Sequence, residues 1–394
     1  MSGAGETGER TGGRGWLSPG EYAPWFVGRT TANPRYSFST VAGRHVVLTF
    51  FGSAGDPLSA AVLSGILDKR AMMDGLNLCF FGVSSDPLDE TIPRVRDTGP
   101  GVRYLWDLDR SIAALYGVTG DGSYSPISYV LDLSLRVIAA IPFGRSAQGH
   151  VEALLAVLQR LPAPVLPYLV AEPAPVLIAP LVFEAGLCRD LIAYYRRTGG
   201  EASGFMREVD GQTVGAMDAA HKRRRDCTIT DPDLVQACLV RIRDRLVPQL
   251  HRFFQFQATR IERYLVSCYD EQDQGHFRAH RDNTTRGTAH RRFAVSLFLN
   301  SGDYEGGLLR FPEFGSGLYS APAGGAIVFS CSMLHEATPV TRGQRYMFLP
   351  FLYDEAARQI RQANAQFLAT PEKPARPAPE GGVPPTSSRE DPAA

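Results

Sequence analysis

The sequence predicts two domains: an α/β sheet with helices on both faces, then a jelly-roll or other β-barrel with supporting helices. Three observations support this prediction. The 394 residues exceed what one ordinary core holds. The first part of the chain alternates continuous apolar runs with segments of helical spacing, as α/β sheets do. From Ile261 onward, short β segments separated by Gly, Pro and Asn replace the helical period, which suits a barrel.

Composition and charge exclude several classes of protein. With 44% hydrophobic and 21% charged residues, the chain has an ordinary globular composition. Basic and acidic residues number 41 each, so we expect neither a nucleic acid nor a membrane as partner. The first 16 residues lack the apolar region of a signal peptide. The scattered cysteines then predict reduced thiols in the cytoplasm; they are Cys79, Cys188, Cys227, Cys238, Cys268 and Cys331.

The predicted first domain covers residues 19–162, after a Gly-rich and polar N-terminus at 1–18 that predicts disorder. Continuous apolar runs predict buried strands, and apolar residues at helical spacing predict helices. We expect strands over residues 45–51, 76–83, 102–106, 128–133 and 136–142, and helices over 57–73, 111–116 and 149–161. The last two strands form a hairpin.

Segments of this domain resemble a known fold. Residues 20–26 (GEYAPWF), 43–51 (GRHVVLTFF) and Ser125-Pro126 are similar to a peroxiredoxin of the thioredoxin-fold superfamily. The resemblance implies an α/β thioredoxin-like fold. Peroxiredoxins place a reactive Cys just after the first central strand, where a helix N-terminus lowers its pKa. Residues 52–58, GSAGDPL, contain no Cys, so we expect a peroxiredoxin-like domain without that chemistry.

The thiol left in this domain is Cys79, within an apolar strand, and we expect it to be buried and inert. A thiol peroxidase that uses Cys79 is the alternative.

The second domain is predicted over residues 175–356, after a linker at 163–174. The apolar run 165–183 contains Glu172 and four prolines, which a membrane-spanning helix tolerates poorly. We expect a strand over 175–183, helices over 184–197 and 231–254, and a polar loop over about 200–228. Within that loop, the run His221-Lys222-Arg223-Arg224-Arg225 is either a solvated loop or a contact for phosphates or an acidic substrate. A short helix and a Pro-rich disordered tail occupy 357–394.

The motif His280-Arg281-Asp282 indicates metal chemistry. On a β-strand, residues i and i+2 point to the same face, so this imidazole and carboxylate can reach one point. A second His from another strand would complete the 2-His-1-carboxylate triad that holds non-haem Fe(II). Downstream lie His335 and, ten residues later, Arg345. A turn at residues 342–343 predicts that Arg345 lies on the strand beside His335.

The segments CYDEQDQGHFRAHRDN, DYEGGLLRFPE and LHEATPVTRGQRY strengthen this indication. They resemble the Fe(II)/2-oxoglutarate-dependent dioxygenases of the prolyl-4-hydroxylase-like class, over about residues 172–354. The resemblance implies a double-stranded β-helix, or jelly roll. It also implies a hydroxylase that releases succinate and CO2 and acts on peptidyl proline, another amino-acid side chain or a small molecule.

The resemblance also assigns roles to residues of this chain. His280, Asp282 and His335 would ligate Fe(II), and Arg345 would bind the far carboxylate of 2-oxoglutarate. Tyr269 would line the co-substrate pocket, O2 would be the second co-substrate, and ascorbate is a further cofactor of the class. One position departs from some relatives: Phe298 stands where they have a hydroxyl-bearing Tyr.

Other residues near the motif are expected to be bystanders. We expect His276 to be no ligand, His290 to face solvent in a loop, and Cys331 to be a small core residue. The remaining histidines have no partner at ligand spacing; they are His45, His150, His221 and His251.

Besides the thiol peroxidase that uses Cys79, two functions stay open at this point. One is an active hydroxylase whose thioredoxin-like domain serves docking or a homodimer. The other is a non-catalytic binding module, or a redox- or oxygen-sensing one, built from two degenerate enzyme domains.

Overall fold

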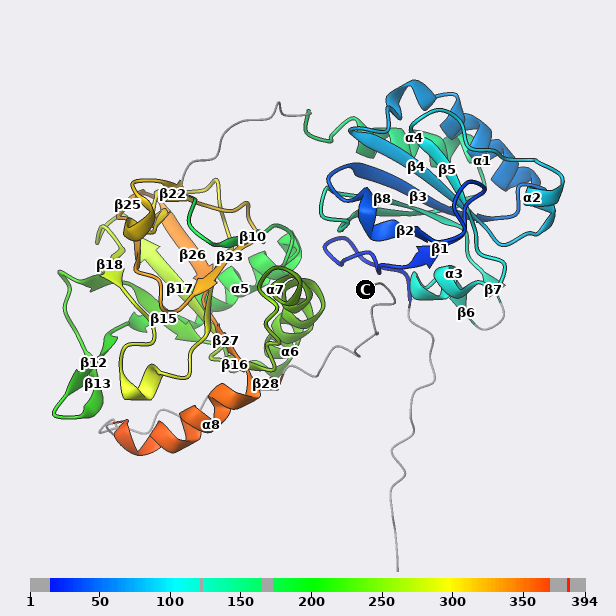
Figure 1. Cartoon of the computed structure of the whole chain (residues 1–394). Coiled ribbons are helices and arrows are strands. Elements are labelled where there is room, and N and C mark those ends of the chain that lie inside the picture. Colours follow the sequence, from blue (N-terminus) through cyan, green and yellow to red (C-terminus); the bar gives the residue numbers. More distant parts are fainter. Residues whose placement is uncertain (1–14, 121–122, 164–172, 369–380, 383–394) are drawn as a thin grey trace, which may run out of the picture. The chain divides into compact units, whose positions relative to one another are not determined.

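The structure, a computed structural model, describes residues 15–120, 123–163, 173–368 and 381–382. The chain divides into two compact units near residue 167, and each unit is described here by itself (Figure 1). Most of the predicted linker, of the N-terminal stretch and of the Pro-rich tail lies outside the described residues. Among the described helices, none has both the length and the apolar character needed to cross a membrane.

Unit 1 is built on a five-stranded sheet in the order β5-β4-β3-β8-β9. Its first three strands pair in parallel and the last two pair antiparallel, as the predicted α/β fold with a late hairpin requires. The strands are β3 (His45–Gly52), β4 (Leu78–Ser84), β5 (Val102–Trp106), β8 (Ile127–Leu131) and β9 (Val137–Pro142). Short strands are β1 (Val27–Gly28), β2 (Tyr36–Ser37), β6 (Thr119–Gly120) and β7 (Ser123–Tyr124).

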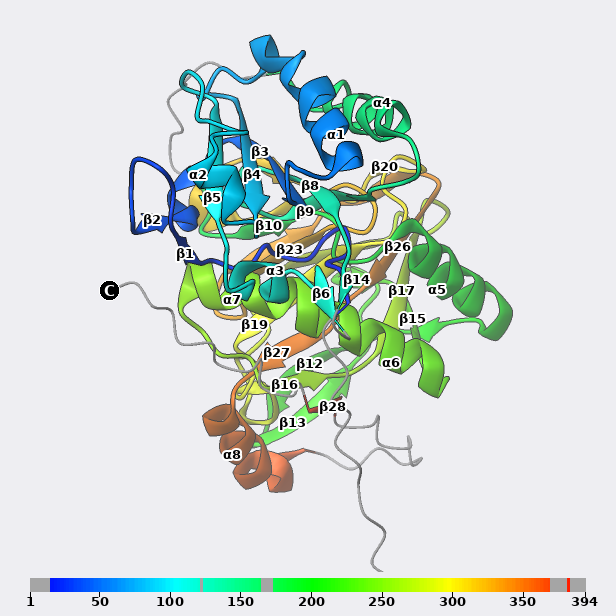
Figure 2. The same ribbon diagram turned by 90° about the vertical axis from the view of Figure 1, so that its right-hand side faces the viewer.

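Separate apolar clusters cover the two faces of this sheet. On one face, α1 (Pro57–Leu67) and α4 (Ala147–Leu158) lie side by side (Figure 2) and pack against Val47 and Phe80. On the other face, α3 (Ser111–Leu115) and the N-terminal segment pack against residues such as Phe50. Strands covered on both sides read as continuous apolar runs, so β3 and β4 were predictable. The unit also contains the short helix α2 (Leu88–Thr91).

Unit 2 contains two main sheets. The larger has the order β11-β15-β17-β26-β19-β27-β16-β28, with β23 beside β19 and β10 beside β23. Its strands are β10 (Leu177–Ala179), β11 (Glu201–Ala202), β15 (Arg225–Thr228), β16 (Arg260–Glu262), β17 (Leu265–Asp270), β19 (Phe293–Phe298), β23 (Ala326–Ser330), β26 (Gln344–Phe348), β27 (Phe351–Tyr353) and β28 (Gly381–Gly382).

The smaller sheet has the order β14-β18-β24-β21-β22. Its strands are β14 (Lys222–Arg223), β18 (His276–His280), β24 (His335–Ala337), β21 (Leu309–Arg310) and β22 (Leu318–Tyr319). Two further antiparallel pairs are β12 (Phe205–Val209) with β13 (Gln212–Ala216), and β20 (Glu305–Gly306) with β25 (Val340–Arg342).

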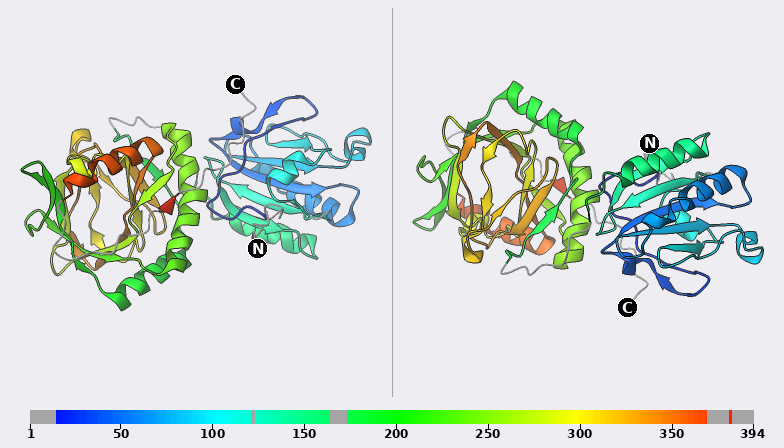
Figure 3. Two further views of the ribbon diagram at one scale, coloured as in Figure 1. Left: turned by 90° about the horizontal axis from the view of Figure 1, so that it is seen from below. Right: turned by 90° about the horizontal axis from the view of Figure 1, so that it is seen from above.

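The larger sheet is apolar on both faces, each for a different partner. Its inner face, with Tyr269 and Phe298, shares one core cluster with Phe277 and Leu309 of the smaller sheet. Its outer face packs against α5 (Ala185–Thr198), α6 (Pro232–Arg241) and α7 (Val247–Phe254), which lie outside the ring of strands (Figure 3). The helix α8 (Glu355–Asn364) follows β27.

Three expectations for unit 2 need correction. The polar loop over 200–228 is wrong, because that segment holds the five short strands β11 to β15. The strand expected over 175–183 is shorter in the structure, where β10 covers only Leu177–Ala179. The single helix over 231–254 contains a π-helical stretch, Ile242–Leu246, between α6 and α7. Pro248 supplies a reason for this stretch, because it lacks the N–H that would bond to Asp244 and its ring crowds that carbonyl.

Gly324 joins the start of unit 2 to its sheet. Its carbonyl accepts from the Phe183 N–H at 2.8 Å, and its own N–H donates to the Phe298 carbonyl at 2.7 Å. Its φ is +79°, and a Cβ added there would lie 2.1 Å from the Phe183 carbonyl oxygen. Both the backbone conformation and the close approach therefore require glycine.

Substituting Gly324→Ala and Gly302→Ala separates these two requirements. Gly302 also has positive φ, +102°, but nothing lies within 4 Å of an added Cβ. Backbone strain should lower the free energy of unfolding by about 1–3 kcal/mol in either variant. The clash should cost Gly324→Ala roughly 1–3 kcal/mol more. Urea denaturation of the full chain measures both; equal losses would contradict the steric explanation.

Candidate functional site

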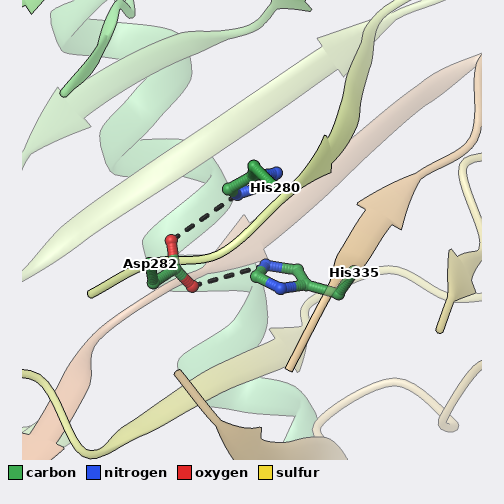
Figure 4. Close-up of side chains that lie close together, drawn as sticks. All are labelled: His280, Asp282 and His335. Carbon is green, nitrogen blue, oxygen red and sulfur yellow. Dashed lines mark ion pairs between the residues drawn. The ribbon is translucent and has the colours of Figure 1, made fainter. Parts of the chain in front are cut away.

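Three side chains that could ligate a metal meet at the smaller sheet (Figure 4). His280 is the last residue of β18 and pairs in register with His335, the first residue of β24. Asp282 lies in the turn after β18, and its N–H donates to the Cys331 carbonyl at 3.0 Å. One potential ligand atom from each of the three side chains lies within 4.8 Å of the other two.

Main-chain carbonyls orient both imidazole rings. Nδ1 of His280 lies 2.7 Å from the Arg278 carbonyl oxygen, and Nδ1 of His335 lies 3.0 Å from that of Met333. Because a carbonyl oxygen only accepts, each Nδ1 carries the proton and each Nε2 presents a lone pair. The two Nε2 atoms lie 3.5 Å and 3.3 Å from carboxylate oxygens of Asp282. Three electron-pair donors thus face one point, which is favourable when a cation lies between them.

Burial sets the charge of this cluster. It lowers the pKa of His335 to about 4, so that this imidazole is neutral at pH 7. Burial alone would raise the pKa of Asp282, but the neighbouring His335 and His280 hold it well below its usual range. A carboxylate beside neutral imidazole nitrogen is the donor set of a non-haem Fe(II) triad. The residues present therefore fit that metal.

The turn that carries Asp282 is tied to the segment before His335. The Arg281 guanidinium donates to the Ser332 carbonyl and pairs with Glu313 at 2.7 Å. These contacts join the two segments that supply the potential ligands. Their spacing is therefore held by protein contacts.

Arg345 lies on β26 opposite Tyr269 of β17, and it is 1% exposed. The carbon at the centre of its guanidinium is 4.9 Å from the ring centre of Tyr269 and 5.3 Å from that of Phe298. A Cβ at Gly307 would meet the Arg345 side chain at 2.6 Å, so glycine leaves room for it. Its Nε has no hydrogen-bond partner among the described residues. A buried cation with free donors is suited to bind an anion.

The expected place of Arg345, on the strand beside His335, is wrong. β24 belongs to the smaller sheet and β26 to the larger one. The chain first passes through β25, which pairs with β20, and only then enters β26. Arg345 therefore approaches the cluster from the opposite sheet.

A cavity of about 690 Å³ brings these groups together inside unit 2. His280, Asp282, His335, Arg345 and Tyr269 all line it, together with apolar side chains of both sheets. Its lining is also rich in cations: Lys222, Arg224, Arg263, Arg281 and Arg291.

The basic run of residues 222–225 alternates between the cavity and solvent. Lys222 and Arg224 are each 8% exposed and line the cavity, whereas Arg223 and Arg225 are exposed. This is the two-residue period of extended chain. Arg224 pairs with Asp226 at 2.5 Å. Of the two alternatives for this run, the solvated loop is therefore wrong for half of its residues.

Lys222 has polar neighbours but no carboxylate partner in the described structure. Its Nζ donates to the Ser203 hydroxyl at 2.8 Å and to the Gly204 carbonyl at 2.5 Å. Burial, and then the charge of Arg224, lower its pKa to about 6.

A second buried network lies beside the cavity. Glu262 accepts from Arg291 at 2.7 Å and from Nε2 of His290 at 2.8 Å. His290 is 2% exposed, so the expectation that it faces solvent is wrong. Its partner in the interior, the carboxylate of Glu262, lies 28 positions earlier in the chain.

Two further residues of the cavity were harder to place from the sequence. The ring centre of His221, the first residue of the predicted basic run, is 6.4 Å from that of His280, although ligand spacing offered no reason to expect it there. Arg263 carried no signal in the sequence, and it lies in the two-residue connection between β16 and β17 with a positive φ of 58°. His276, on the same strand as His280, is not part of the potential metal cluster.

In unit 1, ion pairs close the segment that follows β3. Ser53 donates to Asp86 at 2.6 Å, and the Ala54 N–H donates to Asp89 at 2.8 Å. Arg94 pairs with both carboxylates, at 3.0 Å and 3.1 Å. Carboxylates therefore occupy the surroundings in which a peroxiredoxin keeps its reactive thiol.

Two family profiles match separate segments of the chain. Residues 19–140 match the AhpC/TSA family, and residues 264–353 match the 2OG-Fe(II) oxygenase superfamily. The first segment lies in unit 1, which is thioredoxin-like, and the second in unit 2.

Curated relatives resemble unit 2. A PKHD-type hydroxylase of Phenylobacterium zucineum (strain HLK1) is 31% identical over 165 residues, which cover 38% of this chain and 70% of that protein. A PKHD-type hydroxylase of Shewanella sp. (strain MR-7) is 29% identical over 165 residues, covering 39% and 71%.

Solved structures resemble each part at low scores. A Pseudomonas putida prolyl-4-hydroxylase gives a TM-score of 0.36 at 19% identity, covering 46% of this chain and 94% of that one. A peroxidoxin from Mycobacterium tuberculosis gives 0.33 at 20% identity, covering 37% and 99%.

Labelling with a sulfenate-selective reagent after peroxide treatment tests the thiol of unit 1. Cys79 is buried, and burial raises the pKa of its thiol, so little of the reactive thiolate forms. We expect no label on Cys79 in the folded chain. The unfolded chain, treated in the same way, serves as the positive control. Labelling in the folded chain would support the peroxidase alternative.

The pH dependence of stability tests the state of Lys222. A lysine with a folded pKa of about 6 binds fewer protons when folded than when unfolded, from about pH 6 to pH 10. The free energy of unfolding of the wild type, relative to Lys222→Gln, should therefore rise with pH by up to about 1.4 kcal/mol per unit. Urea denaturation at several pH values measures this difference.

The exposed neighbour gives the control for that experiment. Arg223→Gln should show no such trend relative to the wild type, because Arg223 is exposed. A difference for Lys222→Gln that stays constant with pH would mean that Lys222 is protonated in the folded protein.

Proposed function

Because the chain belongs to the 2OG-Fe(II) oxygenase superfamily, we propose that the cavity of unit 2 is the active site of this 2-oxoglutarate-dependent hydroxylase. His280, Asp282 and His335 would hold Fe(II). The observation that carries this assignment is the orientation of both Nε2 lone pairs toward one carboxylate. When bound, Fe(II) supplies the O2 chemistry that couples decarboxylation of 2-oxoglutarate, to succinate and CO2, with hydroxylation of a substrate C–H bond.

Arg345 would bind and orient the co-substrate. Its guanidinium matches the two oxygens of the far carboxylate of 2-oxoglutarate, and the burial of Arg345 strengthens such a pair. Tyr269 and Phe298 lie against the guanidinium and restrict its rotation. Phe298 brings no hydroxyl, so the Tyr269 hydroxyl and the nearby Arg224, 3.4 Å from it, are the further donors in reach.

Apolar side chains would exclude water around the reacting groups. The Phe277 ring stacks on His280 with ring centres 3.5 Å apart, and Phe329 lies against His335 at 4.6 Å. These rings hold the imidazoles in place and leave the Nε2 atoms facing the cavity. Excluding water protects reactive species and strengthens the binding of charged groups.

The finer features of this proposal follow from the family. The two facing sheets would form the double-stranded β-helix, or jelly roll, and ascorbate would serve as an auxiliary reductant. A reducing, cytoplasmic setting is supported by the six cysteines, all free and buried.

The substrate would be a small molecule or an amino-acid side chain of a peptide. Those residues of β12, β13 and β14 that line the cavity, such as Phe205, Gly215 and Lys222, would contact it. A homodimer through unit 1 stays a prediction.

Turnover of 2-oxoglutarate without substrate tests this function. Protein purified anaerobically receives Fe(II), 2-oxoglutarate and then oxygen, and succinate is quantified. His280→Ala should abolish succinate, because one of three ligands is lost. Arg345→Gln should raise the KM for 2-oxoglutarate roughly a hundredfold, the equivalent of about 3 kcal/mol for a lost charge-assisted pair. Arg223→Gln, an exposed substitution, is the control.

Anaerobic binding gives a readout that does not require turnover. Fe(II) with 2-oxoglutarate should produce a weak visible charge-transfer band in the wild type and not in His280→Ala. Failure of both the band and succinate formation in the wild type would favour the non-catalytic binding module instead.

A further inference from the structure

The basic side chains of the cavity outnumber the carboxylates that pair with them. Arg224 is paired with Asp226, Arg291 with Glu262, and Arg281 with Glu313. The proposed function assigns Arg345 to the co-substrate. Two basic side chains remain without a carboxylate partner in the part of the chain that the structure describes: Lys222 and Arg263.

Arg263 has unused hydrogen-bonding capacity. Its Nε donates to the Leu349 carbonyl at 3.0 Å, and its guanidinium stacks on Phe351 at 4.3 Å. No hydrogen bond from either terminal nitrogen is found within the described residues, and the side chain lines the cavity. These two nitrogens form the fork that matches a carboxylate.

The backbone at Arg263 brings its side chain to the cavity. Its φ of 58° is a left-handed conformation that costs a non-glycine residue free energy, and glycine or asparagine would adopt it more easily. The conformation lies in the two-residue connection between β16 and β17. From this connection the Arg263 side chain lines the cavity.

Burial and like charges disfavour the protonated forms of both groups. Burial, then Arg291 and Arg224, lower the pKa of Arg263 to about 10, although Glu262 and Asp226 act in the opposite direction. Burial, then the charge of Arg224, lower the pKa of Lys222 to about 6, so that in the empty cavity at pH 7 Arg263 is charged and Lys222 is mostly neutral. A carboxylate bound by both groups would pair with Arg263 and favour protonation of Lys222.

We infer that Arg263 and Lys222, which line the same cavity, bind a carboxylate of the substrate to be hydroxylated, so that the substrate is a carboxylic acid with the acid group free. This inference rests on the proposed function, since it names the substrate class of the same cavity. Arg345 and the Arg263–Lys222 pair then hold different carboxylates. Arg345 binds that of the co-substrate and the Arg263–Lys222 pair binds that of the substrate.

Matched acids and amides test the inference even though the substrate itself is unidentified. The full chain, saturated with Mn(II) and 2-oxoglutarate, is titrated calorimetrically with butanoate and with butanamide, at constant ionic strength. We expect saturable binding of butanoate and at least tenfold weaker binding of butanamide, which lacks the charge. Arg263→Gln and Lys222→Gln should each weaken butanoate binding at least tenfold. Arg223→Gln should leave it unchanged.

The outcomes separate this inference from the proposed function. Arg345→Gln should lose 2-oxoglutarate and keep the preference for butanoate over butanamide. If Arg263→Gln instead loses 2-oxoglutarate, Arg263 belongs to the co-substrate site and the inference is overturned. Equal binding of acid and amide, or wild-type affinity for butanoate in both Arg263→Gln and Lys222→Gln, also overturns it.

If the wild type fails to bind Mn(II) and 2-oxoglutarate, the proposed function fails. The same titration of the metal-free chain with butanoate and butanamide then still tests the anion site.

Discussion

A charge buried between two β-sheets needs a partner, and this requirement shapes the interior of unit 2. Glu262 is held between Arg291 and His290, and Arg224 is held by Asp226. Such pairs are costly to desolvate, and removing one member is far worse than keeping both. The pairs therefore constrain the positions of the strands that carry them, and these strands surround the cavity. Where basic side chains lack a carboxylate partner among the described residues, as Arg263 and Lys222 do, the inferred substrate supplies the carboxylate.

The proposed metal ligands and the co-substrate cation come from different sheets. His280 and His335 belong to the smaller sheet, whereas Arg345 belongs to the larger one. Facing sheets are spaced about 10 Å apart by the side chains between them. The shared core cluster, with Phe298 and Leu309 among its members, therefore sets how far the carboxylate site lies from the metal site. Packing and chemistry depend on the same side chains.

Local patterns predicted the elements well and the long-range contacts poorly. β3 and β4 were recognisable because burial on both faces leaves a continuous apolar run. The potential metal ligands were recognisable from their spacing and their resemblance to a known class. The sheet to which Arg345 belongs was not recognisable, because the periodicity of a segment does not show which sheet its strand will join. The burial of His290 was also hidden, since its partner, Glu262, lies on a distant strand.

The ion pairs after β3 limit the chemistry that unit 1 can support. Ser53 lies 2.6 Å from the Asp86 carboxylate, and Asp89 and Arg94 complete the cluster. A cysteine placed at position 53 would put its sulfur against a negative charge, which disfavours the thiolate. A reactive thiol at this position would thus require several coordinated substitutions, each unfavourable alone because it leaves a charge without a partner. Installing peroxidase chemistry in unit 1 is therefore a task of rebuilding the whole charged cluster, and a single cysteine substitution is not sufficient.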